Sequence, residues 1–105
     1  MSSWIWLTGA IACEIGATLA LRASRGFSHP LPVALLLCGY TASFYCLSRA
    51  LQRGLALSTA YAVWSAAGTA IIALLGIAVL GESRSPVKLA SIVLIVISIV
   101  GLRLG

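Results

Sequence analysis

Residues 4–21 read WIWLTGAIACEIGATLAL, an apolar stretch that carries one charged residue, Glu14. Because an α-helix rises about 1.5 Å per residue, a helix beginning at Trp4 would place Glu14 about 15 Å along its axis. The hydrocarbon core of a bilayer is about 30 Å thick, so this carboxyl group is expected near the middle of the membrane. A carboxylate there is costly, and it marks Glu14 as a candidate functional residue.

The composition of the whole chain indicates an integral membrane protein. Of 105 residues, 61% are hydrophobic and 9% are charged, whereas soluble domains have about 45–50% apolar and about 25% charged residues. Each apolar stretch is close to the roughly 20 residues that span a bilayer, and no pattern of short alternating strands suggests a barrel. The sequence therefore predicts an all-α fold: one transmembrane domain over residues 1–105, with helices at about 4–21, 31–50, 57–80 and 86–104.

The basic residues lie at the ends of these stretches, where they are expected to contact lipid phosphates. Short connections make neighbouring helices antiparallel, so one side of the membrane receives Arg49, Arg53 and Arg103, and the other receives Arg22, Arg25, Arg84 and Lys88. The positive-inside bias is therefore almost absent. Either other signals orient the chain, or it inserts both ways and pairs as an antiparallel homodimer, which would build an inverted repeat from two chains.

Several functions are disfavoured by the residues present. Nucleic-acid binding needs basic residues clustered on a solvated surface, and none cluster here. Cys13, Cys38 and Cys46 lack metal-ligand spacing, so no disulfide, metal or cofactor is expected. One buried acid without a neighbouring base does not predict an enzyme, and His29 falls in a connection. The N-terminal stretch is interpreted as a retained helix and not as a cleaved signal.

Small residues surround Glu14 on its predicted helix face. Positions three, four and seven residues away share that face, and they are Leu7, Ala10, Ile11, Ala17, Thr18 and Leu21. Ala10, Ala17 and Thr18 leave room either for close helix packing or for a ligand.

Aromatic residues recur in the second and third stretches. Tyr40, Ser43 and Phe44 lie at helical spacing, as do Tyr61 and Trp64. A tyrosine in the middle of the membrane needs a partner for its hydroxyl group, and Glu14 is the expected one. Taken singly, each aromatic residue is more typical of structural packing. Together with a buried carboxylate they suit a lipophilic cation, which gains cation–π attraction, apolar contact and a counter-charge.

The fourth stretch has no charge or aromatic residue in its middle. Ala90, Ser91 and Ser98 interrupt its Ile, Val and Leu surface, and Ser91 and Ser98 are seven residues apart, which places them on one stripe. This helix is therefore predicted to form the dimer interface. Glu82, in the preceding connection near Arg84, is interpreted as a solvated interfacial charge.

Over nearly its full length the chain resembles the small multidrug resistance family, in its quaternary-ammonium branch. The matching pieces are Glu14 followed by Ala17-Thr18, the Ser24-x-Gly26-Phe27 turn, Pro32, Gly39-Tyr40, Ser43-Phe44, Ala60 to Ser65 with Gly68, and Gly81-Glu82. The guanidinium-exporting branch carries Trp where this chain has Ala17 and lacks a tyrosine like Tyr40. The chain departs from the family at Arg22 (usually Lys), at Ser91 and Ser98 (usually Gly), and at Trp4 (a tyrosine position).

The resemblance implies a dual-topology, antiparallel homodimer in the bacterial inner membrane. It implies a proton-coupled antiporter that exports lipophilic and quaternary ammonium cations by alternating access, with Glu14 exchanging protons for substrate. The expected pocket comprises Trp4, Leu7, Ala10, Ala17, Thr18, Tyr40, Ser43, Phe44, Tyr61 and Trp64. The alternatives are a guanidinium exporter of the same family, a structural membrane subunit in which Glu14 pairs helices, and a passive cation pore.

Overall fold

The computed structural model describes residues 2–105. It contains α1 (Ser2–Ala23), α2 (Pro30–Gln52), α3 (Leu57–Ala78) and α4 (Pro86–Leu104), and none of the residues described is in a strand. All four helices are long and apolar enough to cross a membrane, which confirms the predicted fold class. α1 extends two residues beyond both expected ends, α2 slightly beyond both of its own, and α3 ends two residues earlier than expected.

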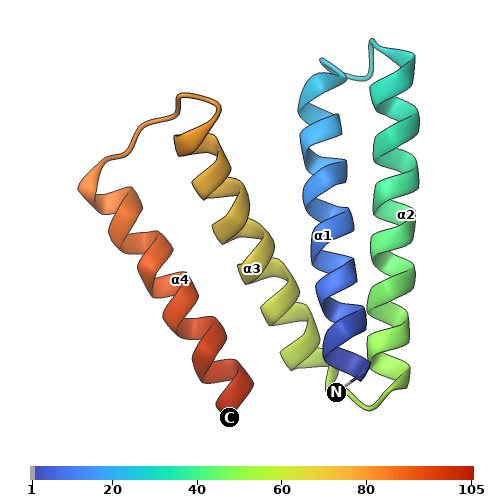
Figure 1. Ribbon diagram of the computed structural model, residues 1–105, viewed down its shortest axis with the longest axis vertical. Helices are drawn as coiled ribbons and strands as arrows, with labels where there is room; N and C mark the ends of the chain where they lie inside the picture. The colour runs from blue at the N-terminus through green and yellow to red at the C-terminus, as the bar shows by residue number, and fades with distance from the viewer. Residues whose placement is uncertain (1) are drawn as a thin grey trace.

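The helices form two antiparallel pairs, α1 with α2 and α3 with α4, and the second pair leans away from the first (Figure 1). The molecule is thin, with extents of 39 × 35 × 16 Å, so the four helices lie nearly in one layer. α3 connects the pairs because it packs against α1, whereas the backbone of α4 approaches only α3 within residues 2–105. Both termini and the α2–α3 connection lie at the same end (Figure 1).

The core lies near that end, where α1, α2 and α3 converge. Its buried centre consists of Leu7, Ala50 and Val63, one residue from each helix. Partly buried side chains surround it, namely Trp4, Trp6, Ile11, Leu47, Leu55, Trp64 and Ile99. The opposite end, towards the α3–α4 connection, is where the helix pairs separate (Figure 1).

Small residues allow α1 and α2 to approach closely. A β-carbon on Gly39 would lie 2.8 Å from the Cβ atom of Ala17 and 3.3 Å from the carbonyl oxygen of Cys13. Ala10 and Ala17 are themselves buried. Membrane helices associate through this kind of contact because lipid supplies no hydrophobic driving force between them.

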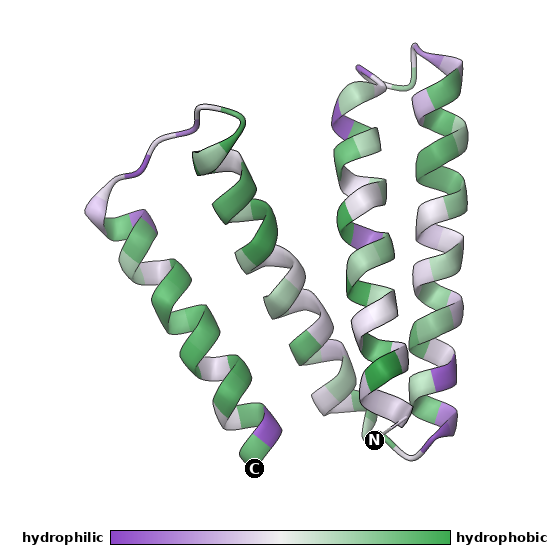
Figure 2. Cartoon of the chain, in the orientation of Figure 1, coloured by the Kyte–Doolittle hydropathy of each residue, from purple (hydrophilic) through white to green (hydrophobic). Residues whose placement is uncertain are grey.

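The outer surface is strongly apolar, as a lipid-facing surface must be. α4 is the extreme case: Ile92 is its only buried residue, and Val87, Leu94 and Ile97 are at least 60% exposed. Figure 2 shows hydrophobic colour along the helices, with most of the hydrophilic colour at their ends and in the connections.

Candidate functional site

Glu14 lines a cleft of about 580 Å³ where the two helix pairs separate. α1 and α2 contribute Glu14, Thr18, Tyr40 and Phe44; α3 contributes Trp64, Ser65, Gly68, Thr69, Ile72 and Ala73; Glu82 and Lys88 lie on or beside the α3–α4 connection. Most of the lining surface is apolar, and Glu14 is only partly buried. The cleft therefore combines an acid with an apolar wall, as a site for an organic cation requires.

A chain of hydroxyl groups joins Glu14 to Tyr40. The hydroxyl of Thr18 donates to Oε2 of Glu14 at 2.7 Å, and its oxygen lies 2.9 Å from the hydroxyl of Tyr40. A threonine hydroxyl has a single proton. With that proton directed to Glu14, Tyr40 is the donor to Thr18. Tyr40 was expected to bond Glu14 directly, and the structure instead interposes Thr18.

Gly68 makes room for the carboxylate on α3. A β-carbon at this position would overlap Oε1 of Glu14 and lie 3.4 Å from its Cδ atom. The helix backbone therefore forms the wall against which the acid rests. Thr18 contacts one carboxylate oxygen and Gly68 faces the other, so the orientation of Glu14 is set from two helices.

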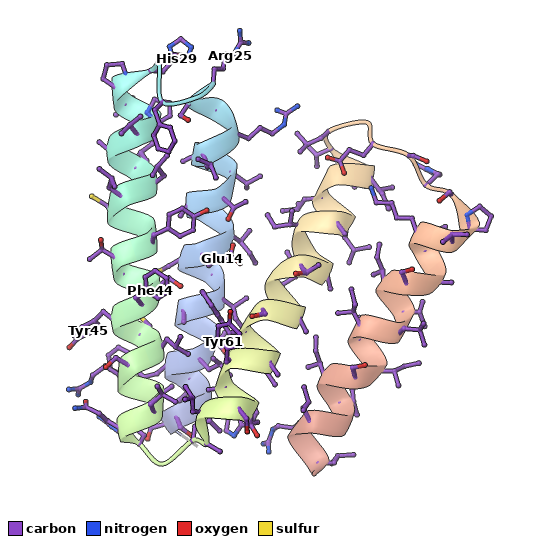
Figure 3. The ribbon with its side chains drawn as sticks, turned by 180° about the vertical axis from the view of Figure 1, so that it is seen from behind. Glu14, Arg25, His29, Phe44, Tyr45 and Tyr61 are labelled. Atoms are coloured by element: carbon purple, nitrogen blue, oxygen red, sulfur yellow. The ribbon has the colours of Figure 1, made fainter. Side chains whose placement is uncertain are left out.

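Three aromatic rings form a cluster, and two of them, Phe44 and Trp64, line the cleft with the acid. The Trp64 ring lies 5.7 Å, centroid to centroid, from both Phe44 and Tyr61, with tilted planes. Figure 3 shows Glu14 on α1, Phe44 on α2 and Tyr61 on α3 along the same side of the molecule, with Tyr45 projecting outward from α2. Phe44 and Tyr61 are more than half exposed. Exposed aromatic faces near a carboxylate are available for contact with a cation.

Ser43 fixes Trp64 from behind. Its buried hydroxyl donates to the carbonyl oxygen of Ala10 at 2.7 Å and accepts from the indole N–H of Trp64 at 3.3 Å. One side chain thereby ties α1, α2 and α3 together. The role of Ser43 is to hold the Trp64 ring that lines the cleft.

The mouth of the cleft carries an ion pair. Nζ of Lys88 lies 3.1 Å from Oε1 of Glu82, and both residues line the same cleft as Glu14. Glu82 was interpreted as a solvated charge near Arg84. Glu82 is exposed, as that interpretation expects, and its partner in the structure is Lys88, in the first turn of α4.

Of the predicted pocket residues, Glu14, Thr18, Tyr40, Phe44 and Trp64 line the cleft. Leu7, Ala10, Ala17 and Ser43 are buried in helix packing, and Tyr61 lies beside Trp64. Trp4 lies elsewhere, with its ring 4.6 Å from the Arg103 guanidinium at the far end of α4. The cleft lining of this single chain therefore does not include Trp4, Leu7, Ala10, Ala17, Ser43 or Tyr61.

Sequence reasoning did not place Thr69, Ile72, Ala73, Glu82 or Lys88 at the site. The first three continue the α3 face that begins with Trp64, Ser65 and Gly68, so helical periodicity could have extended the pocket to them. Helical periodicity could not place Glu82 and Lys88 at the cleft, because their position depends on the path of the connection.

The residues predicted for the dimer interface are all exposed on α4. The hydroxyls of Ser91 and Ser98 donate to the carbonyl oxygens of Val87 and Leu94, at 2.8 and 2.9 Å. Both serine hydroxyl groups therefore have a hydrogen-bond partner within α4 itself. In residues 2–105 no three His, Cys, Asp or Glu side chains gather in a way that could hold a metal ion.

Comparison with known proteins identifies the family. The family model described as "Small Multidrug Resistance protein" matches residues 2–95. The chain is 37% identical to the multidrug resistance protein mmr of Mycolicibacterium paratuberculosis, over 97% of this chain and 95% of the relative. It is 36% identical to a multidrug transporter of Pseudomonas aeruginosa, over 99% and 94%. It is 39% identical to the guanidinium exporter of Escherichia coli K12, over 98% and 97%.

These matches cover nearly the whole chain and agree with the four apolar helices. The resemblance noted in the sequence is thereby confirmed at the level of the family. The chain belongs to the small multidrug resistance family, and it is a multi-pass transporter of the bacterial inner membrane and not an enzyme.

Proposed function

We propose that this transporter is a proton-coupled antiporter that exports lipophilic and quaternary ammonium cations. The observation that carries the proposal is the position of Glu14: its carboxyl group lies in a cleft whose walls include Phe44 and Trp64. The cleft supplies a single anionic group in the middle of a membrane span together with ring faces. Those are the two features by which proteins recognise organic cations.

Proton coupling follows from the cost of leaving this acid charged. A charged carboxylate in the middle of a membrane span is costly unless it is neutralised, so we expect Glu14 to carry a proton or to face a cation. Thr18 donates one hydrogen bond, which eases but does not replace that neutralisation. A proton and a cationic substrate therefore compete for one carboxylate. Binding of the cation releases the proton.

The shape of the site favours bulky cations over guanidinium. A guanidinium ion binds a carboxylate best through both oxygens at once, in a planar fork. Here Thr18 occupies Oε2 of Glu14, and the backbone of Gly68 lies against Oε1. Two relatives, from M. paratuberculosis and P. aeruginosa, are named as multidrug proteins. Guanidinium export is the second candidate, because the E. coli relative of similar identity carries that name.

An antiparallel homodimer would complete the site. In one chain the cleft is lined by residues of α1, α2, α3 and the start of α4, and it lies where the helix pairs diverge (Figure 1). The exposed, largely apolar face of α4 includes Ala90, Ser91 and Ser98. A second, inverted copy would supply a second Glu14 and cover part of this surface. If the two inverted chains exchanged their tilts, the site would open first to one side of the membrane and then to the other, which is alternating access.

The test is transport in proteoliposomes loaded with tetraphenylphosphonium. An imposed proton gradient should drive the cation against its own gradient, with proton movement in the opposite direction, and guanidinium should be exported poorly in the same preparation. Preferential transport of guanidinium would favour the second candidate. A cation flux that does not change with the proton gradient would favour a pore. No flux of either cation would favour a structural subunit.

A further inference from the structure

The cleft in which the transported cation is proposed to bind is also lined by a cationic side chain of the protein, Lys88. Lys88, Glu82 and Glu14 all line that cleft. Lys88 is held by Glu82 at 3.1 Å, and its side chain is 30% exposed. Because Lys88 is tethered to the site, it would compete with a free substrate at a high effective concentration if it were released.

Glu82 is held by the end of α3. Its backbone N–H donates to the carbonyl oxygen of Gly76 at 2.9 Å. Its carboxyl group lies over Gly76 so closely that a β-carbon there would overlap Oε1 and lie 2.6 Å from Cδ. Gly81, with φ of 72°, makes the turn that brings Glu82 back over the helix. The position of this carboxylate is therefore set by the backbone and not only by its cation.

The start of α4 places Lys88 next to Glu82. Ser85 caps the helix by accepting from the backbone N–H of Lys88 at 3.2 Å, and Pro86 follows at the first helical position. Lys88 thus lies in the first turn, where the helix dipole disfavours a cation. The neighbouring Glu82 carboxylate offsets that unfavourable placement. Without Glu82, the Lys88 ammonium would have reason to seek the other acid of the cleft.

We propose that Glu82 is a positioning residue that holds Lys88 away from Glu14, which keeps the Glu14 carboxylate available to the transported cation. The inference rests on the proposed function, since it assumes that Glu14 binds the substrate. Partly exposed ion pairs contribute little to stability. The pair at the mouth is therefore better explained by where it keeps the lysine than by its contribution to folding.

The test measures tetraphenylphosphonium affinity in full-length protein in lipid, for wild type, Glu82→Gln, Glu82→Gln/Lys88→Gln and Glu82→Gln/Arg84→Gln. Arg84 is the matched control for Lys88. It lies in the α3–α4 connection with Glu82, carries the same charge as Lys88 and is outside the cleft lining. Glu82→Gln should bind on the order of tenfold more weakly, because an unpaired ammonium would then share the cleft with Glu14 and compete with the substrate cation for it. Removing Lys88 as well should restore affinity, and removing Arg84 should not.

Each other pattern overturns the inference. Wild-type affinity in Glu82→Gln would show that Lys88 is not restrained by Glu82. Equal weakening in both double variants would mean that Glu82 acts on the substrate directly or through the fold. Equal recovery in both would mean that only total charge matters. Wild-type protein that binds no cation would overturn the proposed function itself, and is distinguished because the other three patterns require wild-type binding.

Discussion

The carboxyl group of Glu14 on α1 rests against Gly68 on α3, at a point where even a methyl group on Gly68 would overlap Oε1. The acid that carries the proposed chemistry is thus in contact with the backbone of the neighbouring helix. Any change in the α1–α3 separation would alter the space around it. This contact also joins the two helix pairs, because α3 is the element through which they meet.

Gly68→Ala should weaken tetraphenylphosphonium binding by about tenfold or more, because the added methyl group must displace either Glu14 or α3. Overpacking of this kind costs about 1–3 kcal/mol. Gly16→Ala is the matched control, since a β-carbon at Gly16 on α1 meets nothing within 4 Å. It should bind normally and unfold at a slightly higher temperature, because alanine favours helix. Equal effects of the two changes on binding would contradict this account of Gly68.

Thr18→Val should break the hydrogen-bonded chain from Tyr40 to Glu14, because valine keeps the shape of threonine but lacks the hydroxyl group that joins them. The ionised carboxylate would lose a hydrogen-bond donor. We therefore expect cation binding to require a higher pH than in wild type, as measured by a titration with tetraphenylphosphonium. Thr8→Val is the control, because the Thr8 hydroxyl bonds only the Trp4 carbonyl in its own helix. An unchanged pH dependence in Thr18→Val would contradict the role given to this hydroxyl.

Ser43→Ala should destabilise the protein, because it removes a buried hydroxyl that bonds Ala10 and Trp64 at once. Leaving the indole N–H of Trp64 without its partner should cost about 1–2 kcal/mol. Thermal unfolding in detergent would measure the loss. Ser58→Ala, at an exposed position near the start of α3, should change stability by less than about 0.5 kcal/mol. Comparable losses in both variants would show that Ser43 does not join the three helices in the membrane.

The antiparallel dimer predicts a specific pattern of cross-links between α4 helices. α4 runs from Pro86 to Leu104, so its midpoint is near Ile95. In an antiparallel pair that crosses at this midpoint, Ser91 of one chain lies opposite Ser98 of the other. In a background without Cys13, Cys38 and Cys46, a mixture of Ser91→Cys and Ser98→Cys chains should therefore form disulfide-linked dimers. Efficient linkage of Ser91→Cys to itself would instead indicate parallel packing.

The sequence predicted the four helices well, because long apolar stretches are strong signals in a membrane protein. The role of the lone charge, Glu14, stays a prediction. The sequence also predicted that Tyr40, Phe44 and Trp64 would lie near Glu14, and all three line its cleft. Helical spacing was enough for this, since each residue shares a face with small or polar neighbours. The antiparallel dimer and the proton coupling stay predictions.

Other parts of the site depend on how helices meet, which spacing along one helix does not specify. Trp4 was expected in the pocket, yet its ring lies against the Arg103 guanidinium at the far end of α4. Ser43 was expected to face a ligand and is buried behind Trp64. The position of Lys88 follows from the turn at Gly81. A local signal for it existed: a lysine in the first turn of a helix is unfavourable and suggests a nearby carboxylate.

The central claim is that a proton and an organic cation compete for Glu14. The most direct measurement is tetraphenylphosphonium binding to purified protein in lipid, from about pH 5 to about pH 9, for wild type and Glu14→Gln. Helicity and oligomeric state of both proteins serve as controls for folding. The account predicts that wild-type binding strengthens as pH rises and that binding is lost in Glu14→Gln at every pH. Binding that ignores pH, or that survives in Glu14→Gln, would contradict it.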